Sequence, residues 1–310
     1  MLHHTTLLSV IVELLAVCFI VSTSHSFVLP PTTVGLGACM SLDSTTPSVC
    51  CSSSSGTTQG TDASGKSRLS IRNEEEGYDL NGILTVKHQE SKGVWVLCHG
   101  LCSSCEGTVS RFVSEKLEAN TFRFDFGGCG ESGGDWKYAG YDREIGDLRA
   151  VVLGLRRLGW SVDSILGHSK GAAAVLQYGE KFDDVPLVVN VAGRFHTSKS
   201  PRSRFTEAQW DQLETTGSFQ WNVKGQDLTI NRSDFEERAA LNMRRTAAAI
   251  KRSKVLTIHG SEDETIPVAD AHDFDQVLLN NELVVVEGGT HRFATEPEQT
   301  KVLKALARYV

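Results

Sequence analysis

Cysteine is scarce in this sequence, and basic residues are neither in excess nor grouped. Its 310 residues include 8 cysteines, which is too few for a fold held together by disulfides. Lys and Arg number 31 against 38 Asp and Glu, so the net charge is -7, and no basic stripe follows the chain. A mildly acidic protein gains little from a phosphate backbone, which argues against nucleic acid as a partner. With 40% hydrophobic and 22% charged residues, the composition is that of a globular protein.

An apolar run long enough to span a membrane is also lacking. The run near the start, residues 7–21, is interrupted by Glu13 and has the length of a signal-peptide core. We therefore predict a signal peptide over residues 1–26, cleaved after Ser26, and no stable membrane span in the mature protein. Because no Lys or Arg precedes the run, an uncleaved anchor or a wrongly chosen start codon stays open as an alternative.

Residues 27–67 contain too little apolar surface to fold. They are rich in Ser, Thr and Gly and nearly free of acidic residues, so we predict a disordered linker or transit peptide. A signal peptide followed by Phe27 and such a stretch resembles the bipartite leader of algae with complex plastids, on the residues from Ser24 to Pro30. This resemblance implies a plastid location. Secretion or an endomembrane location is the alternative.

Residues 68–310 show strands alternating with helices. Residues 143–158 place apolar side chains on one helical stripe, and a last helix begins near Pro297. Several of the predicted strands are continuous apolar runs, as is typical of strands covered on both faces. The pattern predicts the α/β class, with a mostly parallel eight-stranded sheet, helices on both faces and a site at the carboxyl ends of the strands. The eight predicted strands are residues 69–71, 83–86, 94–98, 121–126, 164–166, 187–191, 255–258 and 283–286.

One stretch, about residues 196–253, interrupts the alternation. A helical run over residues 233–250 begins with Ser233 and Glu236, a capping-box pattern. We predict a helical lid insertion, with a merely decorative pair of helices as the alternative. Its aromatic residues indicate that part of the pocket below is apolar; they are Phe205, Trp210, Phe219 and Trp221.

The string GHSKG at residues 167–171 is the strongest motif. It follows the strand that ends at Leu166 and precedes a run of small, helix-forming residues, which is the setting of a nucleophile elbow. Ser169 is the predicted nucleophile. Gly167 and Gly171 let neighbouring backbone approach the tight turn on which the serine sits.

A hydroxyl is a weak nucleophile and needs a base, which His291 can supply. This histidine follows the last predicted strand in a glycine-containing loop. A buried carboxylate would hold the imidazole in the correct tautomer, and we predict Asp263 for this role. Glu262 and Glu264 are its nearest competitors.

An oxyanion requires two preorganised N–H donors. One is the amide of Lys170, directly after the nucleophile. The other is predicted to be the amide of Leu101, in the loop with His99 and Gly100 that follows another strand; His99 is expected to brace this loop. The Lys170 side chain could bring a cation to the site or point to solvent.

Together these motifs resemble the α/β-hydrolase superfamily, close to the serine-aminopeptidase-like and monoacylglycerol-lipase-like serine esterases. The resemblance covers about residues 68–310, in which residues 125–132 match a D-x-x-G-x-G-x-S segment and residues 259–267 match H-G-x-x-D-x-x-x-P. Departures are Lys170 in the elbow and the Gly127–Gly128 pair. The resemblance implies an α/β-hydrolase fold and a triad of Ser169, Asp263 and His291.

The cysteines offer a competing pattern, because Cys98, Cys102 and Cys105 have a spacing that elsewhere ligates an iron–sulfur cluster. Cys98 ends a predicted strand and the motif overlaps the oxyanion loop, so we predict neither a cluster nor zinc. These cysteines and Cys129 lie near one end of the sheet without spaced partners, which favours a reducing compartment.

The predicted reaction is hydrolysis of a small acyl ester or amide through an acyl-enzyme, with no metal or organic cofactor. An acyltransferase or thioesterase is the alternative within the fold. A receptor-like relative that binds ligand and turns over slowly is the alternative outside enzymes. The sequence leaves the substrate and the oligomeric state open.

Overall fold

The computed structural model describes residues 57–62, 65–199 and 202–310. The chain divides into two units, Met1–Cys51 and Ser52–Val310, and the described residues all belong to the second. The predicted signal peptide and most of the segment 27–67 therefore lie outside the described residues.

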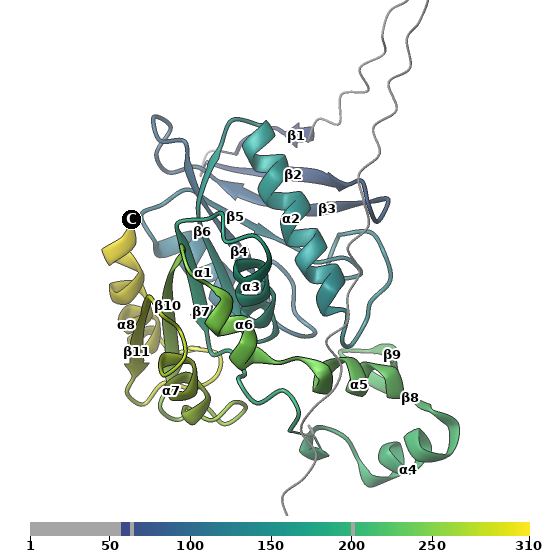
Figure 1. The fold of residues 1–310 in the computed structure, drawn as a ribbon. Helices are drawn as coiled ribbons and strands as arrows, with labels where there is room; N and C mark the ends of the chain where they lie inside the picture. The colour runs from purple at the N-terminus through teal and green to yellow at the C-terminus, as the bar shows by residue number, and fades with distance from the viewer. Residues whose placement is uncertain (1–56, 63–64, 200–201) are drawn as a thin grey trace, which may run out of the picture. The chain divides into compact units, whose positions relative to one another are not determined.

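A mixed sheet forms the centre of the second unit (Figure 1). Among the described residues it has nine strands in the order β1-β2-β3-β5-β4-β6-β7-β10-β11. The strands from β5 to β11 in that order are parallel, and β1, β2 and β3 pair in antiparallel fashion at one edge. Their bounds are β1 (Thr57–Gln59), β2 (Lys66–Asn73), β3 (Tyr78–Thr85), β4 (Gly93–Cys98), β5 (Thr121–Phe124), β6 (Ser161–His168), β7 (Leu187–Val191), β10 (Lys254–Gly260) and β11 (Asn281–Val286).

The eight predicted strands are confirmed, including the edge hairpin, which is β2 and β3. The short strand β1 adds to β2 from within the segment predicted as a disordered linker. That prediction is wrong at its end, because residues 57–59 and 66–67 belong to the sheet. The prediction failed because β1 is held by backbone pairing with β2, and such pairing cannot be inferred from the polar residues of β1 itself.

Two hydrophobic layers cover the sheet, and β4 shows how one strand serves both. Val94, Val96 and Cys98 pack into a core shared with α2 and α3, whereas Trp95 and Leu97 face the core shared with α1 and α8. This alternation is the period of two of a strand buried on both faces. Outside the insertion between β7 and β10, the helices of the two layers are α1 (Thr108–Lys116), α2 (Tyr141–Arg157), α3 (Lys170–Lys181), α7 (Ala269–Asp275) and α8 (Glu296–Leu306).

The insertion between β7 and β10 is partly helical, as predicted, and partly a hairpin. It contains η1 (Arg202–Arg204), α4 (Glu207–Thr216), β8 (Ser218–Val223), β9 (Gln226–Asn231), α5 (Arg232–Ala240) and α6 (Met243–Ala249). The hairpin β8–β9 pairs only with itself among the described strands. Met243, Ala247 and Ile250 pack into the main core, so α6 belongs to the helical layer beside α3.

The predicted run over residues 233–250 differs in two details. It divides into α5 and α6, and the N-cap of α5 lies two residues earlier than expected, at Asn231 rather than Ser233. Asn231 ends β9 with an extended backbone and caps α5, and its N–H donates to Asp234 at 2.8 Å. Ser233 and Glu236 therefore lie inside the helix. An N-cap needs an extended backbone, which the end of β9 supplies at Asn231.

The aromatic residues of the insertion form a cluster of their own. Phe205, Trp210 and Phe219 are buried against one another, with Trp221 and Phe235 packed around them. Tyr138, from the segment before α2, joins the same cluster. The aromatics thus stabilise the insertion and fix it to the main body, which is a different use from the predicted lining of a pocket.

Helix α2 provides a matched test of the hydrophobic core between the sheet and helices α2 and α3. Leu148 is fully buried in the core, whereas Leu153 on the same helix is 37% exposed. Leu148→Ala should lower the free energy of unfolding by about 2–5 kcal/mol, because it leaves a cavity. Leu153→Ala should lower it by about 0.5 kcal/mol or less. Urea unfolding measures both, and equal losses would contradict the two-layer core described above.

Candidate active site

Ser169 stands in a tight turn between β6 and α3. Its backbone has φ 58° and ψ -114°, a conformation that costs a non-glycine residue about 1–3 kcal/mol. The neighbouring glycines make the turn possible: a Cβ on Gly167 would lie 2.1 Å from the carbonyl oxygen of Gly171, and a Cβ on Gly171 would lie 2.5 Å from that of His99. The turn holds Ser169 at the carboxyl end of the sheet, as the elbow motif predicts.

The structure brings Ser169, His291 and Asp263 together. The Ser169 hydroxyl lies 3.0 Å from His291 Nε2, and His291 Nδ1 lies 2.7 Å from Asp263 Oδ2. Asp263 follows β10 and His291 follows β11, so the contacts join three loops at the carboxyl ends of the strands. The Asp263 side chain has no exposed surface and His291 is 7% exposed, which keeps these hydrogen bonds away from solvent.

Asp263 is held in place from both of its oxygens. Its Oδ1 accepts from the amides of Thr265 and Ile266, at 2.8 and 2.7 Å, and its Oδ2 also lies 3.3 Å from His259 Nε2. Burial alone would raise the pKa of Asp263, but hydrogen bonds from His259 and His291 outweigh it and hold the pKa well below its usual value. The competitors Glu262 and Glu264 are exposed, and neither contacts the His291 ring.

The loop after β4 lies directly against Ser169. A Cβ on Gly100 would come within 3.1 Å of Ser169 Cβ, so only the bare backbone fits there. His99 Nδ1–H donates to the Gly100 carbonyl at 2.8 Å, and Nε2 accepts from the amide of Phe126 at 3.1 Å. Burial lowers the pKa of His99, which favours this neutral form. His99 thus ties the loop carrying Leu101 to the end of β5.

The Lys170 side chain points neither to solvent nor to the nucleophile. It is 8% exposed, forms an ion pair with Glu144 of α2, and lies 5.0 Å from the centre of the Tyr141 ring. Burial raises the pKa of Glu144, and the nearby Lys170 ammonium opposes that rise. The pair fastens the start of α3 to α2.

Two residues of the site were not anticipated from the sequence. His168 Nε2–H donates to the His291 carbonyl at 2.8 Å, and burial, together with the neighbouring His291, lowers the pKa of His168 to about 4. His168 is therefore neutral at pH 7. Glu298 accepts hydrogen bonds at 2.6–2.7 Å from the amides and hydroxyls of Thr290 and Thr295. It clamps the His291 loop to the N-terminus of α8. The capping-box pattern Thr295–Glu298 could have been found from the sequence, but its bond to Thr290 could not.

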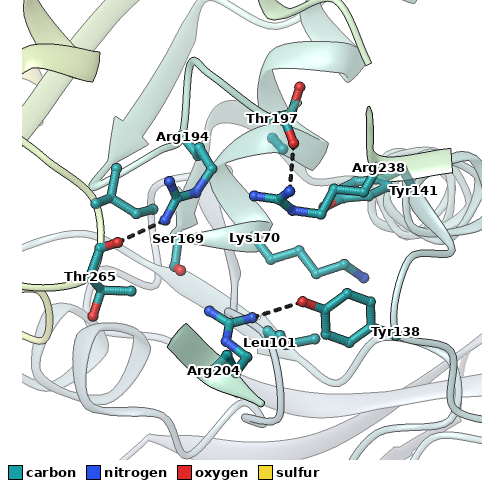
Figure 2. A pocket seen from close by; sticks show the side chains of 12 residues that line it. Leu101, Tyr138, Tyr141, Ser169, Lys170, Arg194, Thr197, Arg204, Arg238 and Thr265 are labelled. Atoms are coloured by element: carbon teal, nitrogen blue, oxygen red, sulfur yellow. Dashed lines mark hydrogen bonds between the residues drawn. The ribbon is translucent and has the colours of Figure 1, made fainter. Parts of the chain in front are cut away.

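A pocket opens over Ser169, and its lining is rich in cations (Figure 2). Besides Leu101, Ser169 and Lys170 it is lined by three arginines, which were also not anticipated. The lining residues are Leu101, Tyr138, Tyr141, Ser169, Lys170, Ala173, Arg194, Thr197, Arg204, Arg238, Thr265 and Ile266. None of the aromatic side chains of the insertion is among them.

The thiols near the site are separate and protonated. Cys98, Cys102, Cys105 and Cys129 are all free; burial raises the pKa of Cys98, and it raises those of Cys105 and Cys129 to about 12. Within the described part of the chain, no three His, Cys, Asp or Glu side chains are grouped as metal ligands would be. The helices of that same part include none that is long and apolar enough to cross a membrane.

Comparison with known proteins identifies the architecture. No protein-family model matches the chain, and no curated protein matches it. Solved structures do match. Est1E from Butyrivibrio proteoclasticus, bound to ferulic acid, has a TM-score of 0.62 at 18% identity, over 77% of this chain and 96% of that one. A putative hydrolase from Agrobacterium vitis gives 0.63 at 17% identity, over 82% and 99%. A Pyrococcus furiosus esterase gives 0.60 at 21% identity, over 78% and 90%.

The chain has the α/β-hydrolase fold. At these identities the likeness establishes the fold and leaves the activity to be argued from the site. In this α/β-hydrolase fold, the loops after β6, β10 and β11 carry Ser169, Asp263 and His291, and the loop after β4 carries Leu101.

The clamp at Glu298 leads to a pH-dependent prediction. Burial would raise the pKa of Glu298, but four hydrogen bonds lower it from 4.5 to about 2. A lowered folded-state pKa stabilises the fold above the unfolded value and loses that contribution as pH falls toward the folded value. Glu298→Gln should therefore lower the free energy of unfolding by about 1–3 kcal/mol at pH 7, and by progressively less between pH 4.5 and pH 3.

Glu296→Gln is the matched control, because Glu296 stands in the same helical turn with its side chain 85% exposed. Urea unfolding at pH 7, 4.5 and 3 measures both variants. A Glu298→Gln deficit that stays constant over this range would contradict the ionised clamp.

Proposed function

We propose that the protein is a serine hydrolase that cleaves a carboxylic ester, or a related acyl bond, through an acyl-enzyme intermediate. The observation that carries this proposal is the hydrogen-bonded series from Ser169 through His291 to Asp263, in which Ser169 lines a pocket. The fold agrees with it, since neighbours of the same architecture are named esterases and hydrolases.

In the proposed acylation, Ser169 Oγ attacks the substrate carbonyl carbon while His291 Nε2 takes the hydroxyl proton. The imidazolium that forms is stabilised by ionised Asp263, and the neutral state of His168 adds no opposing charge beside it. His291 then gives the proton to the alcohol oxygen as the bond between that oxygen and the carbonyl carbon breaks. Water repeats the sequence on the acyl-enzyme, releasing the acid and restoring Ser169.

The negative charge that develops on the substrate carbonyl oxygen needs hydrogen-bond donors directed at that oxygen. We assign this role to the amides of Leu101 and Lys170. Supporting observations are the contact of Gly100 with Ser169, the bracing of that loop by His99, and the position of Lys170 at the first turn of α3, where the helix dipole favours negative charge.

A fluorophosphonate probe tests the nucleophile and the acid together. Wild-type protein should be labelled at Ser169, and Ser169→Ala should not be labelled. Asp263→Asn should slow labelling by roughly 10³-fold or more, because the amide permits the wrong imidazole tautomer. Glu262→Gln, an exposed neighbour, is the matched control and should label at the wild-type rate.

In-gel fluorescence against time measures these rates. Labelling of a different residue, or equal rates for Asp263→Asn and Glu262→Gln, would contradict the proposed triad. Labelling of Ser169 without steady turnover of any ester would instead favour a receptor-like binding protein.

We also propose a plastid location, which rests on the leader sequence alone. A fluorescent fusion of residues 1–70 tests it in an algal cell with complex plastids. Fluorescence confined to the secretory route would overturn the plastid location and favour secretion.

A further inference from the structure

The pocket over Ser169 contains an unusual concentration of positive charge. In Figure 2 the guanidinium groups of Arg194 and Arg204 lie on either side of Ser169, and Arg238 and Lys170 line the same pocket. Arg194 follows β7, Arg204 ends η1 and Arg238 belongs to α5. The main body thus provides the nucleophile, and the insertion with its leading segment provides the arginines.

None of these arginines has a carboxylate as a hydrogen-bond partner among the described residues. Lys170 is paired with Glu144, but the three arginines bind neutral acceptors. Arg194 donates to the Thr265 carbonyl at 2.7 Å, Arg204 to the Tyr138 hydroxyl at 3.2 Å, and Arg238 to the carbonyls of Thr197 and Lys199. Among the residues that the structure describes, no carboxylate forms an ion pair with any of the three.

Their positive charges also act on one another. Burial lowers the pKa of Arg194, and the charges of Arg238 and Arg204 lower it further, whereas the nearby carboxylates of Asp270 and Asp263 act in the opposite direction. Arg238 is 8% exposed. Arg204 is exposed, so the argument from burial concerns Arg194 and Arg238: buried charge without a hydrogen-bonded counter-charge is costly and favours a bound anion. The planar guanidinium fork matches the oxygens of a carboxylate or a phosphate.

The aromatic residues of the insertion add no surface to this pocket. Phe205, Trp210 and Phe219 are buried against one another within the insertion and do not line the pocket. The surface beside Ser169 thus combines cationic groups with apolar side chains such as Leu101 and Ile266.

We propose that this pocket selects acyl substrates that carry an oxyacid anion, a carboxylate or a phosphate, which Arg194, Arg204 and Arg238 bind while Ser169 attacks the ester carbonyl. This inference rests on the proposed serine hydrolase activity and adds its substrate class. Arg238 also anchors the backbone at Thr197 and Lys199, so Arg194 and Arg204 are the better residues to test.

The test compares substrates that differ only at one end. The 4-nitrophenyl esters of hexanoic acid, adipic acid and 5-phosphonopentanoic acid present a methyl, a carboxylate and a phosphonate at the same place. Ethyl hexanoate and the hexanoyl ester of glycolate make the same methyl-to-carboxylate change on the alcohol side. Rates with Ser169→Ala provide the uncatalysed background.

We expect kcat/KM for an anionic substrate to exceed that for its neutral match by roughly ten- to a hundredfold, in the acyl or the alcohol series, as charge-assisted hydrogen bonds would give. The series that responds identifies the side on which the anion binds. The carboxylate and phosphonate esters then distinguish the two kinds of anion.

Arg194→Gln and Arg204→Gln should each lower this anionic-to-neutral ratio by roughly tenfold, and Arg204→Lys should retain part of it. Arg111→Gln, an exposed arginine on α1 whose side chain is 60% exposed, is the matched control and should leave the ratio unchanged. Circular dichroism and melting temperature verify that each variant is folded.

Turnover of neutral esters with no anionic preference in either series would overturn the inference and leave the proposed hydrolase standing. A preference that survives both Arg→Gln variants would also overturn it. Absence of Ser169 labelling together with absence of turnover of every ester would overturn the proposed hydrolase itself, so the two failures are distinguishable.

Discussion

The close approach of backbone around Ser169 is the constraint on which the site depends. Ser169 adopts a positive φ because the strand before it and the helix after it must meet within a turn, and Gly167 and Gly171 leave room for carbonyl oxygens where side chains would clash. The strain is offset by the surrounding structure: the Ser169 amide donates to the Val191 carbonyl of β7 at 2.9 Å, and α3 buries its small residues beneath the sheet. Every other part of the site is positioned relative to this turn.

The remaining elements reach that turn through bonds between loops. His99 links the loop after β4 to the end of β5, His168 holds the backbone of His291, and Glu298 fastens the same loop to α8. Because each bond joins segments far apart in the sequence, the geometry is a property of the assembled sheet. Parallel strands provide this naturally, since their carboxyl ends meet at one edge.

The sequence predicted the elements whose signal is local. Continuous apolar strands, the amphipathic α2 and the glycine-flanked serine can each be read from a few neighbouring residues, and the order of the motifs then indicated Asp263 and His291. The residues that were missed act at long range. Nothing near Arg204 or Arg238 in the sequence indicates that they meet in one pocket, and Asn231 caps α5 only because β9 ends there. The hairpin β8–β9 is exposed along much of its length, so its strands lack the apolar pattern that marks those of the main sheet.

The insertion between β7 and β10 consists of two parts that pack differently. Helix α6 packs beside α3 and returns the chain to the start of β10, which makes it the ordinary crossover between two parallel strands. The stretch from η1 to α5 has its own aromatic core and carries two of the three arginines. In the proposed enzyme, most of the anion-binding arginines therefore lie in a stretch of the chain apart from Ser169, Asp263 and His291, and Arg194 lies between β7 and that stretch. Under the proposed function, exchange of the contiguous stretch from η1 to α5 would change part of the substrate pocket while Ser169, His291 and Asp263 stay untouched, so specificity would evolve, or be engineered, largely apart from the chemistry.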